Sequence, residues 1–163
     1  VKLWRKPDED SEVFVNHAEV SRTLFISFLT GLKLIKDFKL AQPMGESLAK
    51  ARPRNAALWR SGLSNEVLKA NVEGMRELFL EVFAAPVGAD NPGADEGVDL
   101  DFRQMLFDLT RLTKPLGEAA ADEKERVLLE QLRQTATKIQ KEGGGGAAKA
   151  TDQLLGFNSL DGD

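Results

Sequence analysis

The chain has 163 residues, of which 42% are hydrophobic and 29% are charged, which is the composition of an ordinary soluble globular domain. It contains no cysteine, so disulfides, iron–sulfur clusters, thiolate zinc sites and cysteine nucleophiles are excluded. A single histidine, His17, argues against a serine triad and against a histidine-rich metal site.

Helical periodicity dominates the first part of the chain. After an N-terminal arm over residues 1–11, apolar residues spaced three, four or seven apart predict a helix over residues 12–40, capped by Ser11. Pro43 and Gly45 would end this helix.

The next segment predicts a shorter second helix over residues 46–62. Pro53 has no backbone N–H to donate, so we expect this helix to be split or kinked. Its apolar residues Leu48, Ala51, Leu58 and Trp59 would face inward.

Three further elements follow in the pattern. Residues 64–84 form a clear amphipathic helix, and residues 85–98, rich in Pro, Gly and acids, predict a long loop. Asp99 would cap a helix that runs to about residue 112, and Asp122 with Glu125 would form the capping box of a last helix ending near residue 139.

The C-terminal part reads differently from the rest. The four glycines at residues 143–146 predict a flexible joint. Beyond it, one helical turn would carry Leu154, Leu155 and Phe157, either as a docking peptide or as a tail that folds back or stays disordered.

These elements predict an all-α protein without strands. The expected fold is an up-down-up-down four-helix bundle with a split or kinked second helix and a flexible C-terminal tail. Its parts would be an arm (1–11), the bundle (12–142) and a glycine linker with a short turn (143–163).

The sequence offers no catalytic constellation. A di-iron bundle needs two Glu-x-x-His pairs, and this chain has one histidine and no such motif. The glycine run does not follow a strand, so it does not match a phosphate-binding loop. We therefore expect no enzyme activity, no metal and no cofactor.

Charge is distributed unevenly along the chain. Residues 22–60 carry eight Lys or Arg against two acids, a net +6, whereas residue 61 onward carries a net −8. The basic segment predicts a docking patch for an acidic protein surface, the alternative being a solvated face that stabilises a helix end. The candidate partner-binding residues are Lys33, Lys36, Lys39, Lys50, Arg52, Arg54 and Arg60, with Leu154, Leu155 and Phe157 in the tail.

Two stretches resemble the PsbQ-type extrinsic subunits of photosystem II, in a divergent, algal-type form. The first is Trp59-Arg60 followed by LSNEVLKANVEGMRELF, and the second is QMLFDLTRLTKPLGEAAADEKERVLLEQLRQTATKI. The resemblance implies a non-catalytic bundle in the chloroplast thylakoid lumen. It would dock by charge on the photosystem II core, beside other extrinsic subunits, to support the oxygen-evolving centre.

Other properties leave alternatives open. No apolar run approaches the ~18 residues that a membrane-spanning helix needs, so a membrane partner would be met peripherally, and no pattern typical of nucleic-acid binding is present. The chain starts at Val1 without Met, which indicates either a removed presequence or trimming. The rival functions are a soluble helical adaptor that uses its LLGF tail, and a small-molecule carrier or enzyme with a site in the core.

Overall fold

The computed structural model describes Phe14 and residues 16–155, with side chains up to residue 146. Its first half contains α2 (His17–Lys33), the π-helix η1 (Leu34–Ala41), α3 (Gln42–Met44) and the 3₁₀ turns η2 (Leu48–Lys50) and η3 (Pro53–Asn55). Then follow α4 (Ser64–Leu78), the π-helix η4 (Phe79–Phe83), α5 (Ala84–Asp90), α6 (Ala94–Thr110), α7 (Leu116–Ala120) and α8 (Glu123–Leu155).

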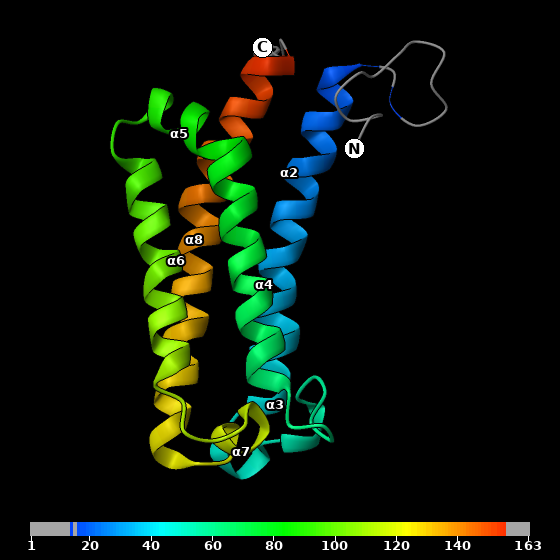
Figure 1. The fold of residues 1–163 in the computed structure, drawn as a ribbon, viewed down its shortest axis with the longest axis vertical. Coiled ribbons are helices and arrows are strands. Elements are labelled where there is room, and N and C mark those ends of the chain that lie inside the picture. The colour runs from blue at the N-terminus through cyan, green and yellow to red at the C-terminus, as the bar shows by residue number, and fades with distance from the viewer. Residues whose placement is uncertain (1–13, 15, 156–163) are drawn as a thin grey trace, which may run out of the picture.

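These elements build four antiparallel rods, so the expected all-α four-helix bundle is confirmed (Figure 1). The first rod joins α2, η1 and α3, the second joins α4, η4 and α5, and α6 and α8 are the third and fourth. Helix α8 packs against α2, α6, α5 and α7, so it contacts elements of all three other rods. No helix in the described part of the chain is long and apolar enough to cross a membrane.

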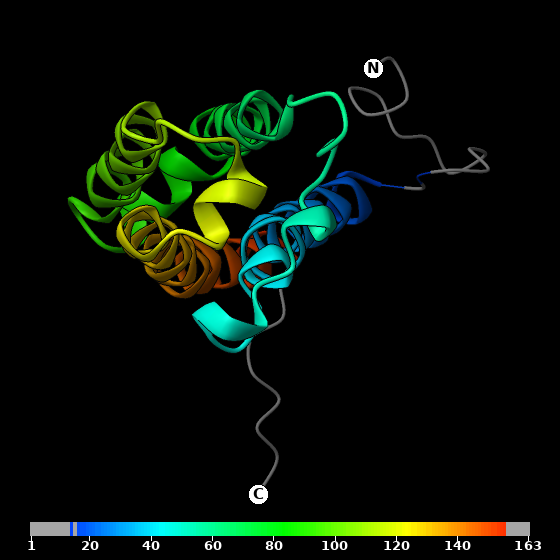
Figure 2. The same cartoon turned by 90° about the horizontal axis from the view of Figure 1, so that it is seen from below.

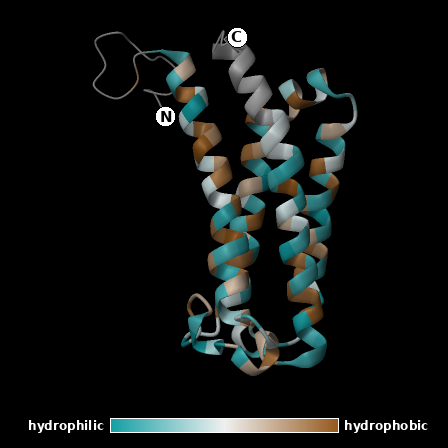
Figure 3. Cartoon of the chain, turned by 180° about the vertical axis from the view of Figure 1, so that it is seen from behind, coloured by the Kyte–Doolittle hydropathy of each residue, from teal (hydrophilic) through white to brown (hydrophobic). Residues whose placement is uncertain are grey.

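The core is apolar and runs the length of the rods. Three fully buried phenylalanines connect the first three rods: Phe79 lies 5.9 Å from Phe28 and 6.3 Å from Phe102, measured between ring centroids. Hydrophobic and hydrophilic residues alternate along each helix, as an amphipathic bundle requires (Figure 3). Burial of this apolar surface is the main force that holds the rods together.

Helix starts follow local hydrogen-bond chemistry, but not always at the expected residue. The Asn16 side chain caps α2 by accepting from the Glu19 N–H at 3.0 Å, whereas the expected cap, Ser11, lies outside the described residues. The Asp122 cap is confirmed, since its carboxylate accepts from the N–H groups of Lys124 and Glu125. Asp99 is not a cap, because α6 begins five residues earlier and buries Asp99 in its interior.

The segment over residues 46–62 is not a second helix, contrary to expectation. It forms the two short turns η2 and η3 and a further set of turns, because Pro53 interrupts the helical hydrogen bonds and Leu58 adopts a φ of 55°. Leu48, Leu58 and Trp59 are 41%, 53% and 42% exposed, so their expected inward orientation is also wrong.

The expected loop over residues 85–98 is mostly helical. Residues 84–90 form α5, and α6 starts at Ala94 after a short turn in which Gly93 has a φ of 86°. Pro86 lies close to the junction of η4 and α5, where Phe83 has a φ of −112°, and its missing N–H removes one hydrogen bond from the helix there.

The glycines at residues 143–146 lie inside α8 and do not form the expected flexible joint. Gly143 and Gly144 are buried, and a Cβ on Gly144 would lie 2.8 Å from Leu29 Cδ2. The missing side chains let α2 approach α8 closely, which offsets the poor helix propensity of glycine. The arm over 1–11 and Phe157 lie outside the described residues, and for Leu154 and Leu155 only the helical backbone is described.

Candidate functional site

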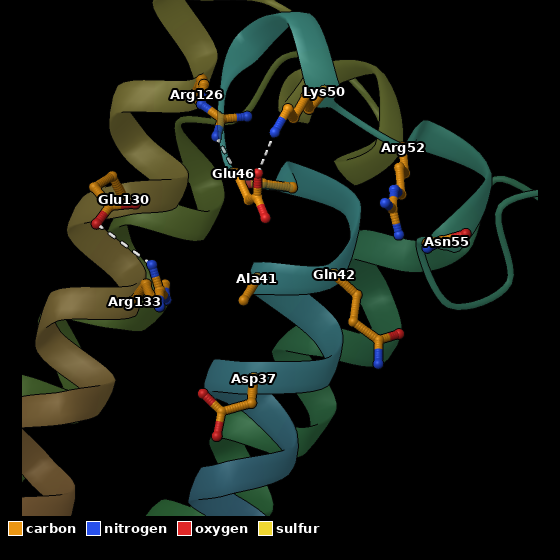
Figure 4. A pocket seen from close by; sticks show the side chains of 11 residues that line it. Asp37, Ala41, Gln42, Glu46, Lys50, Arg52, Asn55, Arg126, Glu130 and Arg133 are labelled. Carbon is orange, nitrogen blue, oxygen red and sulfur yellow. Dashed lines mark hydrogen bonds and ion pairs between the residues drawn. The ribbon is translucent and has the colours of Figure 1, made fainter.

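A groove of about 740 Å³ opens at the end of the bundle where the chain passes from the first rod to the second (Figure 4). One wall is the start of α8, and the other is formed by η1, α3 and the turns after them. Its lining is Asp37, Ala41, Gln42, Gly45, Glu46, Lys50, Arg52, Asn55, Arg126, Glu130 and Arg133.

The floor of the groove is held by Arg126. Its guanidinium donates to the carbonyl oxygens of Met44 at 2.6 Å, Ala120 at 3.0 Å and Gly45 at 3.2 Å. These carbonyls end α3 and α7, so the cation satisfies groups that helix termini leave without partners. Arg126 thus has a structural role: it holds the reversal of the chain after α3 against α8.

Gly45 makes the reversal possible. Its φ is 60°, and a Cβ there would lie 2.2 Å from the Lys50 carbonyl oxygen. Only glycine fits this backbone conformation and this close approach. The side chains of Glu46 and Lys50, four residues apart on the rim, form an ion pair.

Two arginines on opposite walls remain available to a ligand. The Arg52 side chain is exposed and makes no hydrogen bond or ion pair with any described residue. Across the groove, the Glu130 carboxylate lies 3.8 Å from Arg133 Nη1, which is beyond hydrogen-bond distance, and no other described carboxylate pairs with Arg133. Figure 4 shows Arg133 with Glu130 on the α8 side, and Arg52 with Asn55 on the other side.

The seven basic candidates lie in different surroundings. Lys33 is exposed at the end of α2, while the Lys36 ammonium donates to Gln140 Oε1 on α8 at 2.8 Å. Burial lowers the pKa of Lys39. The i, i+3 spacing of these three lysines assumes an α-helix, whereas Leu34–Ala41 is π-helical, so the spacing does not place them in one row.

The remaining four basic candidates divide between two hollows. Lys50 and Arg52 line the groove, whereas Arg54 and Arg60 flank the Trp59 ring, with their guanidinium carbons 5.6 Å and 5.3 Å from its centroid. This second hollow, of about 550 Å³, is also lined by Pro115 and by Gly117 and Glu118 of α7. Their proposed role in partner binding stays a prediction.

Sequence reasoning missed the α8 wall of the groove. Arg126, Glu130 and Arg133 follow one another at spacings of four and three, which places them on one side of a helix. That spacing was available in the sequence. The facing wall was not, because it depends on the irregular turns between Gly45 and Asn55.

A buried carboxylate, Asp99, joins α6 to α4. Asp99 on α6 accepts a hydrogen bond from Arg76 Nε on α4 at 2.6 Å and another from Arg103. Burial raises the pKa of Asp99, but the hydrogen bonds from Arg76 and Arg103 outweigh it, so the pKa lies below its usual value. The ion pair therefore stabilises the contact between α4 and α6.

Replacing Asp99 with asparagine should lower the free energy of unfolding at pH 7 by about 1.5 kcal/mol. The pKa of Asp99 is lower in the folded state, so the ion pair contributes fully above the unfolded value of about 4 and is lost as the pH falls below it. The difference in the free energy of unfolding between wild type and Asp99→Asn, measured by urea titration, should thus decrease as the pH is lowered from 7 towards 2. An exposed control, Glu77→Gln, should show no such difference at pH 7, and a difference for Asp99→Asn that stays constant with pH would contradict the ion-pair account.

Fold and site together define an all-α bundle with a charged groove at one end. The chain belongs to the imelysin family (Peptidase_M75), whose family model matches residues 1–142. No curated protein and no solved structure matches it. Among the described residues there is no group of three or more His, Cys, Asp or Glu that could hold a metal ion.

The family match overturns the resemblance to PsbQ-type subunits and the photosystem II function drawn from it. Both quoted stretches fall within the matched residues, and their apolar spacing is what any bundle helix needs to face a core. The adaptor alternative gains no support from the match either. The lumenal location rested on the same resemblance and stays untested.

Proposed function

We propose that the chain is a binding domain, without catalysis of its own, that takes a small polar ligand with two anionic groups into the end groove. The observation that carries the proposal is the pair of arginines on opposite walls: Arg52 has no side-chain partner among the described residues, and the carboxylate beside Arg133 is 3.8 Å away. Guanidinium groups bind carboxylates and phosphates through paired hydrogen bonds. A volume of about 740 Å³ suits a ligand of small-molecule or short-peptide size.

The acidic residues of the groove restrict the ligand further. Glu46 is paired with Lys50, while Asp37 lies on the η1 wall, 3.9 Å from Lys36. A ligand with anionic charge throughout would meet these carboxylates, whereas one with anionic ends and a neutral or positive middle would not. We therefore favour a short acidic peptide over a polyanion.

Binding, not chemistry, is also favoured by how the helices use their buried polar groups. Asp99 is bound by two arginines, Asp108 pairs with Arg111 at 3.2 Å, and the Ser64 hydroxyl donates to the Ala57 carbonyl. In each case the partner belongs to the fold, so the side chain acts in stability.

Titration calorimetry with the peptide Glu-Gly-Glu tests the proposal, with Lys-Gly-Lys as the charge-reversed probe. We expect Glu-Gly-Glu to bind, and the double variant Arg52→Gln/Arg133→Gln to bind it at least tenfold more weakly, because charge-assisted hydrogen bonds of about 1.5 kcal/mol or more are lost. Binding should weaken with salt.

The matched control is Lys69→Gln on α4, which removes an exposed, ion-paired cation outside the groove. It should leave the affinity for Glu-Gly-Glu unchanged. Equal affinities for wild type and the double arginine variant, or a preference for Lys-Gly-Lys, would contradict the proposal.

A further inference from the structure

The connection over residues 47–63, which we name the tip loop, combines exposed apolar and cationic side chains. It lies at the end of the bundle, beside α3 and α7 (Figures 1 and 2). Its sequence contains no Asp or Glu. Its exposed large apolar residues are Leu48, Leu58, Trp59 and Leu63, and its cations are Lys50, Arg52, Arg54 and Arg60.

The backbone of the tip loop holds Leu58 outward. Leu58 has a φ of 55°, a left-handed conformation that is strained for a leucine, and its side chain is 53% exposed. The turn around it is fixed, because the Ser61 N–H and hydroxyl both donate to the Leu58 carbonyl at 3.1 Å and 3.0 Å. Strain that maintains an exposed apolar side chain points to a contact outside the chain.

Trp59 adds the second apolar group, with two cations over its ring. Arg54 and Arg60 hold their guanidinium carbons within 6 Å of the indole centroid, at 5.6 Å and 5.3 Å. A tryptophan flanked by arginines suits the boundary between headgroups and acyl chains, where the indole is partly buried and the cations meet phosphates.

We propose that the tip loop docks on an anionic lipid surface, with Leu58 and Trp59 entering the headgroup region. Charge favours an anionic partner for this loop, since the loop carries four cations and no acid; the acids beside it are Glu118 of α7, which lines the hollow at Trp59, and Glu46, which pairs with Lys50. Docking would place the tip-loop end of the bundle on the lipid surface. The inference does not rest on the groove ligand: Lys50 and Arg52 of the tip loop line the groove, but Arg54, Leu58, Trp59 and Arg60, on which the test depends, do not.

Trp59 fluorescence tests the proposal directly. The chain has two tryptophans, so Trp4→Phe leaves Trp59 as the reporter. With vesicles of phosphatidylcholine and phosphatidylglycerol (about 7:3), we expect a blue shift and quenching by brominated acyl chains. Neutral phosphatidylcholine vesicles should give neither signal, and salt should reverse both.

Two variants in the Trp4→Phe background separate insertion from folding. Leu58→Gly suits the left-handed backbone and removes the apolar group, and Arg54→Gln/Arg60→Gln removes the cations beside the ring. Each should lower vesicle partitioning at least tenfold, with an unchanged circular dichroism spectrum. The control Phe107→Ser, at an equally exposed site on α6, should partition like the parent.

The proposal is overturned if anionic vesicles give no shift in Trp59 emission, which would leave an acidic protein surface as the partner of the tip loop. It is equally overturned if vesicles bind without quenching Trp59, or if both tip-loop variants partition like the parent. Either result would assign membrane contact to another face.

Discussion

Replacing Phe79 with alanine should lower the free energy of unfolding by about 3–5 kcal/mol, because the substitution leaves a cavity where three rods meet. Phe79 is fully buried, and its ring contacts Phe28 on the first rod and Phe102 on the third. Removing it therefore costs both burial and two aromatic contacts. Urea denaturation at pH 7 measures the change.

The control for this experiment is Phe107→Ala, since Phe107 lies on α6 with 60% of its surface exposed. That substitution should change stability by less than about 0.5 kcal/mol. If both alanine variants lost similar stability, the Phe28–Phe79–Phe102 cluster would not be the centre of the core.

Gly117→Ala should lower the free energy of unfolding by about 2–3 kcal/mol, because the new methyl group has no space. A Cβ on Gly117 would lie 2.3 Å from the Pro53 carbonyl oxygen, and that atom belongs to the backbone of the tip loop. A backbone segment cannot rotate away as a side chain can. The loop would have to separate from α7, so the spectrum of Trp59 should change together with stability.

Gly74→Ala provides the matched substitution on α4, where a Cβ would meet nothing within 4 Å. Alanine is the better helix former, so this variant should gain about 1 kcal/mol. The two variants thus carry the same substitution, and their effects on the free energy of unfolding should have opposite signs. A gain for Gly117→Ala would show that α7 and the tip loop are not packed as described.

The sequence sufficed for the rods but not for their ends. Apolar spacing predicted residues 64–84 as a helix because that stripe must face the core, and α4 with η4 covers nearly the same residues. It failed at residues 143–146, where glycine propensity favours a break while packing against Leu29 and Val98 favours a helix. Local propensity cannot report such a distant contact.

For the same reason, only one wall of the candidate groove could be predicted from the sequence. Arg126, Glu130 and Arg133 share a helix face that the sequence displays. Arg52 lines the same groove only because Gly45 reverses the chain and Arg126 holds that reversal against α8. The spacing of Lys33, Lys36 and Lys39 was counted on an α-helix, whereas Leu34–Ala41 is π-helical, so only their expected alignment in one row is wrong.

The two π-helical stretches, Leu34–Ala41 and Phe79–Phe83, have a consequence for reading relatives of this protein. A π turn accommodates one more residue than an α turn does. A homologue that lacks the extra residue would keep the same rods, yet every position after the deletion would move by one in the alignment. The assignment of residues to the core or surface face of a helix must therefore be made separately before and after each π-helical stretch. Otherwise core residues of one sequence would be aligned with surface residues of the other.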